Sequence, residues 1–394
     1  MPPRSIAVSG IANYFFMSVS SAILAPYLQL YLKARGLTPS RIGLLLGVLE
    51  LAGVVGPILI GRLSDRRSAY RALLAACFIV PVLVFLPMQV TTLFWVYLAC
   101  VLVMGFTYRA TIPLLDSLVS RLLPDPTQQY GPLRVAGSLG FIAISLFLQL
   151  TGLITGDSSL PILVGFGVSS VVAAIVVVFL PPAPPAPVVH GAADNGKGEF
   201  DAKFWIVIGV IFLGRFGIGA YYSFFSLYLK QAFPHTGVSL LWAIGPLAEA
   251  GPILFSGPII KRFGIRALLI VSLAAVSVRL GLFVIAPSLL VVALAQLLHG
   301  FTFGTFHTAA VAYINGKIGP ARRGVGMAIY NSVGLGLSAF FASVVGGFVL
   351  EAHGFVFLFL SYAAVPLLGI VVLVVSGKGL FAPRARVPAG GRAA

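Results

Sequence analysis

Long runs of apolar residues, separated by short clusters of charged residues, proline and glycine, follow one another along the chain. A helix that crosses the roughly 30 Å hydrocarbon core of a bilayer needs about 20 such residues. Cutting the chain at the polar clusters predicts twelve spans, at about 6–32, 41–61, 71–90, 92–120, 130–154, 160–180, 203–229, 238–260, 266–286, 288–316, 323–350 and 354–376. We therefore expect an all-α polytopic membrane protein with twelve transmembrane helices.

The composition supports this class. Of the 394 residues, 59% are hydrophobic and only 9% are charged, and the mean hydropathy is +1.04. A soluble domain is about a quarter charged, so a soluble enzyme and a nucleic-acid-binding protein are excluded and the lipid bilayer is the expected partner. Both cysteines, Cys77 and Cys100, lie in apolar runs, where we expect free thiols that pack like small apolar residues.

The net charge of +16 is explained by topology. With the N-terminus in the cytoplasm, 19 of the 26 lysines and arginines fall on the cytoplasmic side, three fall inside spans, and the outer loops hold only Lys33, Arg35, Arg41 and Lys230. This bias follows the positive-inside rule. It predicts a protein of the plasma (inner) membrane with both termini in the cytoplasm, and it leaves no need for nucleic acid as a partner.

The first apolar run is too long for a signal peptide, whose apolar region covers about 7–15 residues, so we expect it to be retained as a helix. The only long polar stretch is the Pro- and Gly-rich segment 181–202, which predicts a cytoplasmic linker. The expected domains are a six-helix bundle over 1–180, this linker, a second six-helix bundle over 203–377, and a basic cytoplasmic tail over 378–394.

The two sides of the linker repeat each other. Leu30-Tyr-Leu-Lys33 recurs as Leu227-Tyr-Leu-Lys230, and Gly105-Phe-Thr-Tyr108 recurs as Gly300-Phe-Thr-Phe303, at offsets of 197 and 195. A third, weaker match relates Gly61–Arg66 to Gly257–Arg262 at an offset of 196. Ordered matches at half the chain length indicate two pseudo-symmetric six-helix repeats. Transporters built this way bind their substrate near the membrane midplane, between the repeats.

The run Gly61-Arg-Leu-Ser-Asp65-Arg66 resembles the loop motif between helices two and three of the major facilitator superfamily. The resemblance implies a cytoplasmic gate, in which Gly61 permits close helix approach while Asp65 and Arg66 form switchable ion pairs. Ordinary positive-inside charge is the alternative. The second half carries a degraded copy with Lys261 and Arg262, and because Lys261 stands where the first copy has Asp65, the halves cannot latch identically.

A narrower resemblance covers most of the chain. Four strings resemble the branch of that superfamily that includes phenylpropionate permeases and borders the nucleoside and oligosaccharide proton symporters: Arg109–Asp116, Tyr130–Phe141, Trp242–Glu249 and Gln296–His307. The resemblance implies transport by alternating access. It also implies that helices one, four, seven and ten line the cavity.

Six ionisable residues fall inside predicted spans: Glu50, Arg109, Asp116, Arg215, Glu249 and Arg279. A charge at the bilayer centre costs at least about 2.5–3.5 kcal/mol, so such residues are functional candidates. Glu249, near the middle of its span, is the first candidate for proton coupling, and Glu50 is the second, because a desolvated carboxylate can load and release a proton near neutral pH. The alternative is a permanently protonated glutamate bonded to a backbone carbonyl.

The candidates for substrate binding are Arg109, Arg215, His299, His307, Tyr14 and Tyr222. A guanidinium offers a planar fork to a carboxylate, so either arginine could bind an anionic substrate. The alternative role is a static pairing of Arg109 or Arg215 with Glu50 or Glu249. The alternative for the two histidines is a structural role, and the alternative for the two tyrosines is a place in the core or in the interfacial belt. Asp116 and Arg134 lie nearer the cytoplasmic end and are expected in the gate, while Arg279 is expected to be structural.

These features predict a monomeric secondary transporter that takes up a small organic carboxylate, aromatic acids included, together with protons. A sugar or nucleoside proton symporter and a proton-coupled exporter of apolar compounds are the alternatives. We expect no cofactor and no metal, since His299 and His307 have no cysteine or carboxylate at ligand spacing. Nucleotide is not expected either, because Gly191–Gly198 ends in glycine where a phosphate-binding loop needs Ser or Thr. Without a nucleophile–base pair in the spans, we expect no enzyme.

Overall fold

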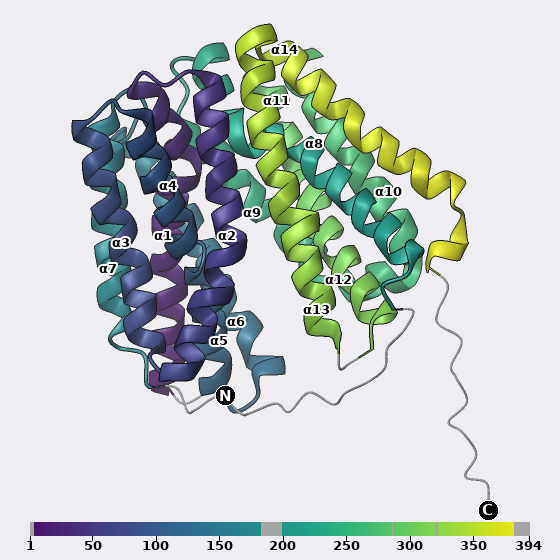
Figure 1. Ribbon diagram of the computed structural model, residues 1–394, viewed down its shortest axis with the longest axis horizontal. Coiled ribbons are helices and arrows are strands. Elements are labelled where there is room, and N and C mark those ends of the chain that lie inside the picture. The colour runs from purple at the N-terminus through teal and green to yellow at the C-terminus, as the bar shows by residue number, and fades with distance from the viewer. Residues whose placement is uncertain (1–3, 183–198, 286, 320–321, 382–394) are drawn as a thin grey trace, which may run out of the picture.

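The computed structural model describes residues 4–182, 199–285, 287–319 and 322–381, and all regular elements in these ranges are helical (Figure 1). The linker residues 183–198 and the tail residues 382–394, both part of the predicted cytoplasmic segments, lie outside the described residues. Within the described ranges, ten helical stretches are long and apolar enough to cross a membrane, and Val238–Leu254 is a shorter apolar helix. The expected all-α polytopic membrane fold is confirmed.

The first half contains seven helices that make six crossings. They are α1 (Arg4–Ala34), α2 (Pro39–Arg67), α3 (Tyr70–Val90), α4 (Phe94–Tyr108), α5 (Thr111–Leu122), α6 (Pro126–Thr151) and α7 (Ser159–Val177). The predicted span 92–120 comprises α4 and α5, which are interrupted at Arg109 and Ala110. This interruption places Arg109 at a helix end rather than in the middle of a continuous helix.

The second half repeats this plan with more interruptions. Its elements are α8 (Ala202–Ala232), α9 (Val238–Leu254), α10 (Ser256–Ile285), α11 (Leu289–Leu297), the π-helix η1 (Gly300–Thr305), α12 (Phe306–Lys317), α13 (Arg323–Ile329), the π-helix η3 (Tyr330–Leu337), α14 (Ser338–Val375) and η4 (Lys378–Phe381). The bend in α14 falls at Gly354, whose φ of 76° suits glycine, and it divides 323–375 into the last two predicted spans.

The prediction of one continuous helix over 238–260 is wrong. The structure ends α9 at Leu254 and starts α10 at Ser256, and the helix then bends again at Gly264, where φ is 77°. Pro252 lies two residues before the break and has no N–H to donate to the helix, so it weakens the last turn of α9.

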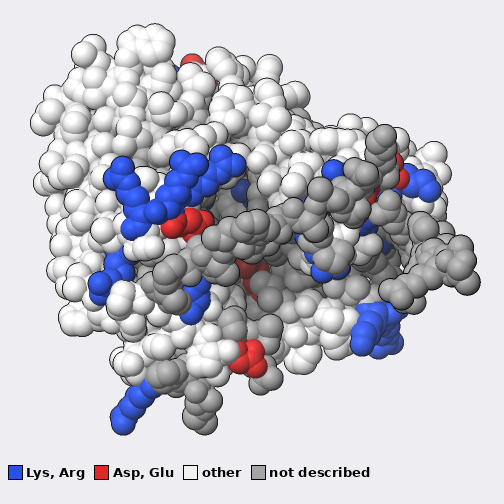
Figure 2. Space-filling model, turned by 60° about the horizontal axis from the view of Figure 1, so that its bottom comes forward, with Lys and Arg blue, Asp and Glu red and all other residues white. Residues whose placement is uncertain are grey.

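The helices form two groups, with α1–α7 on one side and α8–α14 on the other (Figure 1). We call the face where α1 and α8 begin the terminal face, and the other end of the helices the opposite face. In Figure 1 the groups meet at the top, the opposite face, and diverge toward the terminal face. Lysine and arginine side chains gather on the terminal face (Figure 2).

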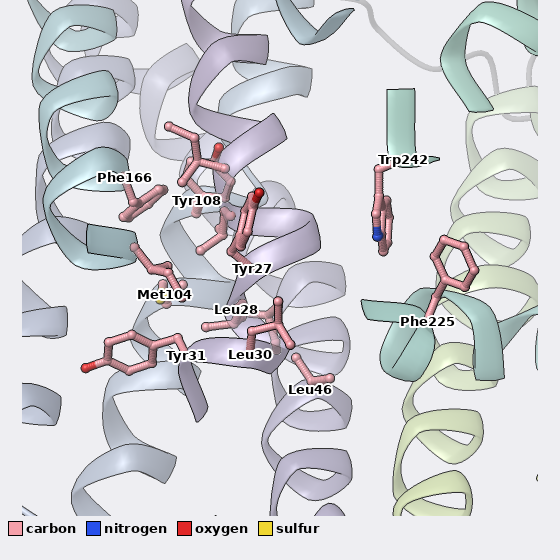
Figure 3. Packing of buried hydrophobic residues seen from close by; sticks show 14 of the residues in the cluster. Tyr27, Leu28, Leu30, Tyr31, Leu46, Met104, Tyr108, Phe166, Phe225 and Trp242 are labelled. Carbon is pink, nitrogen blue, oxygen red and sulfur yellow. The ribbon is translucent and has the colours of Figure 1, made fainter. Parts of the chain in front are cut away.

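Contacts between the halves cluster at the opposite face. Among the described residues, each hydrogen bond that joins the halves lies in that part of the molecule, including Tyr27–Ser239 at 2.5 Å and Lys230–Asp157 at 3.3 Å. One apolar core cluster continues there from the first half into the second, where it includes Phe225 and Trp242 (Figure 3). A separate cluster under the terminal face belongs to the second half alone. The space between the halves is therefore sealed at the opposite face.

The internal repeat is visible in matching contacts. Arg71 donates to the carbonyl oxygen of Leu180 at 3.1 Å, and Arg266, 195 positions later, donates to that of Leu373 at 3.0 Å. Arg71 thus binds a carbonyl just after the last helix of the first half, and Arg266 binds carbonyls in the last turn of the last helix of the second half, where such groups lack helical partners. The two pseudo-symmetric bundles are confirmed, while the domain boundaries at 180, 202 and 377 stay predictions.

The linker's last residues are tied to the second half. Asp201 caps α8 by accepting from the Phe204 amide at 2.9 Å, and it pairs with Lys317 at 2.7 Å. Desolvation opposes ionisation of this carboxyl, but the hydrogen bonds from Lys317 and the Phe204 amide outweigh it, so the pKa of Asp201 lies below its ordinary value. The start of α8 is therefore joined to the end of α12.

Candidate functional site

A cavity of about 460 Å³ lies between the two halves. It is lined from α1, α2, α4, α5 and α6 in the first half and from α8, α9, η1 and α14 in the second. Its aromatic lining comprises Tyr108, Phe141, Tyr221, Tyr222, Trp242 and Phe303, and its ionisable lining comprises Glu50, Arg109, Arg215, Glu249 and His299. Volume and lining suit a small organic molecule with a few polar groups. Most of the predicted substrate and proton residues therefore meet here.

Arg109 forms an ion pair with Glu50 across the cavity wall of the first half. The pair depends on Gly105, because a Cβ at this position would overlap the backbone of Leu49, the residue before Glu50. Glycine lets α4 approach α2 closely enough for the side chain one turn later to reach the carboxylate. The structure thus realises the alternative in which Arg109 has a static acidic partner.

Arg215 has no such acidic partner within the described ranges. Its guanidinium lies 4.3 Å from the ring centroid of Tyr222, and its buried Nε has no hydrogen-bond partner. Among the described residues, none of the ion pairs includes Arg215. A cation over an aromatic face is favourable, but it leaves the N–H donors free. Arg215 is therefore the cavity arginine with unused positive charge and unused donors.

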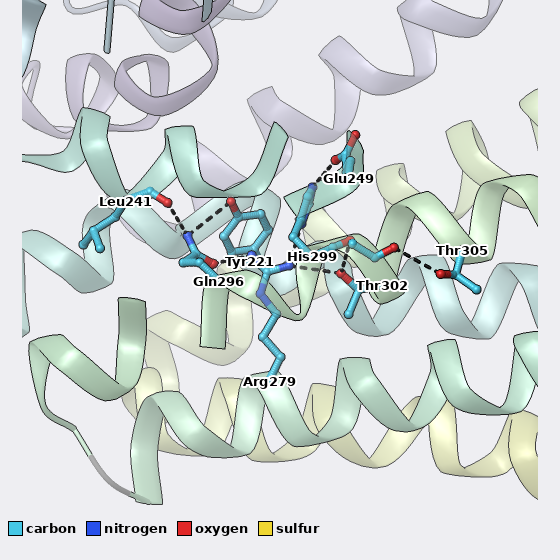
Figure 4. Close-up of polar contacts among 9 residues, drawn as sticks. Tyr221, Leu241, Glu249, Arg279, Gln296, His299, Thr302 and Thr305 are labelled. Atoms are coloured by element: carbon cyan, nitrogen blue, oxygen red, sulfur yellow. Dashed lines mark hydrogen bonds and ion pairs between the residues drawn. The ribbon is translucent and has the colours of Figure 1, made fainter. Parts of the chain in front are cut away.

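Glu249 binds His299 across the second half of the cavity, with 2.6 Å between Oε1 and Nε2 (Figure 4). This pair also depends on a glycine, because a Cβ at Gly300 would overlap the carbonyl oxygen of Ala248, the residue before Glu249. Gly105 and Gly300 are the repeated glycines of the two halves. The same close approach therefore places one carboxylate per half beside a basic side chain.

The other nitrogen of His299 faces Arg279, with 2.6 Å between Nδ1 and Nη1 (Figure 4). A guanidinium only donates, so Nδ1 must accept and the ring's N–H must be on Nε2. His299 is then neutral and donates from Nε2 to Oε1 of Glu249. This polar chain runs from the fully buried Arg279 to the carboxylate at the cavity surface.

Sequence reasoning assigned Arg279 a structural role and did not connect it with the site. The structure shows that it holds His299 in place, and that Thr302 and Gln296 hold Arg279 (Figure 4). Its guanidinium also lies 3.9 Å from the ring centroid of Tyr221. These residues come from several helices, and no spacing in the sequence relates them. The buried charge itself was the only available signal.

Two predicted substrate residues do not line the cavity, and this part of the prediction is corrected. His307 bonds to Tyr330 at 2.7 Å, and Phe303 separates it from His299 in a stack of three rings. Tyr14 donates to Asp116 at 2.8 Å. The π-helix η1 lies between His299 and His307 and has more residues per turn than an α-helix. A prediction that assumes α-helical spacing therefore places His307 on the wrong face.

Asp116 and Arg134, both predicted in the gate, form an ion pair of 3.8 Å within the first half. The Arg134 guanidinium also lies 5.4 Å from the Tyr14 ring centroid. Tyr14 therefore belongs to this cluster on α1, α5 and α6 rather than to the substrate pocket. The gate role of the pair stays a prediction.

Asp65 accepts from Arg121 at 2.7 Å and from Tyr70, so its partners also belong to the first half. The expected close helix approach at Gly61 is wrong here, because a Cβ on Gly61 would meet no atom within 4 Å. Arg66, Lys261 and Arg262 are exposed at the terminal face. The halves diverge at this face, and in the part of the chain that the structure describes no ion pair joins them there.

We expect Asp65→Asn to have a small effect on stability. The Asp65 side chain is 46% exposed in its pair with Arg121, and exposed ion pairs contribute about 0–1 kcal/mol. Thermal unfolding in detergent should therefore shift by a few degrees at most. Arg67→Gln, which changes a neighbouring exposed residue, is the control. A loss of several kcal/mol for Asp65→Asn would contradict this expectation.

Comparison with known proteins identifies the family of this chain. The model of the MFS_1 like family matches residues 9–361. The protein named "Probable 3-phenylpropionic acid transporter" from Escherichia coli (strain K12) is 28% identical over 373 residues, covering 91% of this chain and 94% of its own. "Nucleoside permease NupG" from the same organism is 22% identical over 358 residues, covering 84% and 83%.

A solved structure titled as the nucleoside transporter NupG superposes with a TM-score of 0.80 at 18% identity, covering 94% of this chain and 98% of its own. This likeness supports the fold. Together with the family match over most of the sequence, the repeat and the cavity between the halves, it shows that this chain belongs to the MFS_1 like family of the major facilitator superfamily, whose members are secondary transporters.

Proposed function

We propose that this protein takes up a small organic carboxylate, aromatic acids included, together with a proton, and that Arg215 binds the carboxylate. The observation that carries the proposal is the free guanidinium of Arg215 in a cavity that is otherwise internally paired. A substrate carboxylate can accept two parallel hydrogen bonds from it. The rings of Tyr221, Tyr222 and Trp242 offer a flat substrate an apolar wall.

The charges around the cavity favour one anion. Arg109 and Glu50 neutralise each other, and Glu249 offsets one of Arg215 and Arg279, so one positive charge is left when both carboxylates are ionised. Protonation of Glu249 removes a negative charge and strengthens the attraction for an anion. Bound anion in turn favours protonation of Glu249, because coupling between two sites is reciprocal.

We place the terminal face in the cytoplasm, because the lysines and arginines concentrate there. On this assignment the described conformation is open inward and closed outward. We also propose a monomer as the transporting unit, because the cavity lies between the two halves of a single chain.

Purified protein in liposomes tests the function. An inward-directed proton gradient should drive accumulation of aromatic and short-chain carboxylates, and thermal unfolding should shift upward with the same acids. Nucleosides and sugars are the comparison set, since the relatives include nucleoside permeases and "Maltose permease" from Geobacillus stearothermophilus. Stabilisation by a nucleoside or sugar alone would favour that alternative, and extrusion of apolar dyes would favour export.

A further inference from the structure

The amide of Gln29, on α1, is buried between the halves next to the cavity. Its oxygen accepts from the backbone N–H groups of Ser226 at 3.1 Å and Leu227 at 3.4 Å, and its nitrogen donates to the carbonyl oxygen of Tyr222 at 3.5 Å. All three partners lie within a short stretch of α8, in the other half. A single side chain of the first half therefore holds one segment of a helix of the second half.

The backbone of α8 does not require this contact. Within a helix the N–H of Ser226 already has the carbonyl of Tyr222 as its partner, so α8 is satisfied without Gln29. Gln29, in contrast, is only 1% exposed, and all of its side-chain hydrogen bonds reach α8. A buried amide without partners is unfavourable. The contact therefore stabilises the joined arrangement of the halves rather than the helix.

Position 29 corresponds to position 226 in the internal repeat, at the offset of 197 that relates Lys33 to Lys230. Ser226 is too short to repeat the contact, and its hydroxyl accepts from Trp242 in its own half at 3.0 Å. The first half therefore makes this contact with the second half, and the equivalent position of the second half makes no such contact in return. The segment that Gln29 holds also carries Tyr222, whose ring lies against Arg215 in the cavity.

We propose that Gln29 is the latch of the opposite-face seal and that it sets the balance between the two access states of the transporter. Opening at the opposite face must separate α1 from α8, and Gln29 then loses its three partners together. Other contacts of the seal, such as Tyr27 with Ser239, contribute one hydrogen bond each. The proposal concerns the conformational equilibrium and does not depend on which substrate is carried.

Gln29→Met tests the proposal, because methionine keeps the length of the side chain and removes its hydrogen bonds. Gln89→Met is the control: the Gln89 amide also forms hydrogen bonds on both of its ends, but its partners, the side chains of Tyr31 and Ser159, lie within the first half. Spin labels on cysteines introduced at Thr92 and His235, exposed loop residues of the two halves at the opposite face, report the separation there. The native cysteines are buried.

For Gln29→Met we expect the population with a long label separation to rise at least about tenfold over wild type, which corresponds to about 1.4 kcal/mol. Gln89→Met should leave the distance distribution as in wild type. Gln29→Leu also removes all three hydrogen bonds and adds no charge, so it should give a comparable rise, and it serves as the readout if the methionine variant does not fold. An unchanged distribution in the Gln29 variants, or an equal change in Gln89→Met, would overturn the proposal.

Discussion

Glu249→Gln should abolish accumulation of substrate against its gradient while exchange of internal for external substrate continues. The glutamine side chain matches glutamate in shape and still accepts from His299 through its oxygen, but it cannot take up a proton. A gradient of one pH unit supplies about 1.4 kcal/mol per proton, enough for about tenfold accumulation. In the variant the ratio of internal to external substrate should therefore fall to about one.

Proteoliposomes loaded at fixed pH allow accumulation against the gradient and exchange of internal for external substrate to be measured in one preparation. Both assays use the same labelled substrate. Glu50→Gln is the matched control, because Glu50 is the corresponding cavity carboxylate of the first half and is paired with Arg109. It should retain uphill accumulation. If Glu249→Gln still accumulates substrate, or if Glu50→Gln is the variant that loses accumulation, Glu249 is not the proton carrier.

Arg215→Lys should weaken binding of the transported carboxylate by about 10- to 100-fold. Lysine keeps the positive charge but loses the planar fork, and hydrogen bonds to charged groups contribute about 1.5–3 kcal/mol. Arg109→Lys should have the smaller effect, because the charge of Arg109 is already paired with Glu50. From the sequence alone both arginines are candidates, and the observed ion pair of Arg109 with Glu50 favours Arg215.

Binding measured by calorimetry or thermal shift separates the charge from the rest of the substrate when the acid and its neutral amide are compared. The amide should bind wild type weakly and lose little more in Arg215→Lys. Equal binding of acid and amide to wild type would remove the anion hypothesis, and the nucleoside or sugar alternative would take its place. An equal loss in both lysine variants would show that Arg215 has no special role.

The apolar runs by themselves determined the all-helical membrane fold and the number of spans, because burial in lipid requires a continuous apolar stretch of about 20 residues. The repeated strings likewise determined the two-bundle plan. The position of ionisable residues inside apolar runs also identified candidates for substrate binding and proton coupling that line the cavity: Glu50, Arg109, Arg215, Glu249 and His299. Each of these conclusions depends only on neighbours in the sequence.

Only the tertiary structure decided which of these side chains meet. Arg109 lies against Glu50 because α4 approaches α2 closely at Gly105, whereas none of the ion pairs among the described residues includes Arg215. The contact of Arg279 with His299 likewise depends on the packing of α10 against the start of η1. The pairing of charges follows the rotation and separation of neighbouring helices, and a hydropathy pattern specifies which face of a helix is apolar without specifying which helix that face will meet.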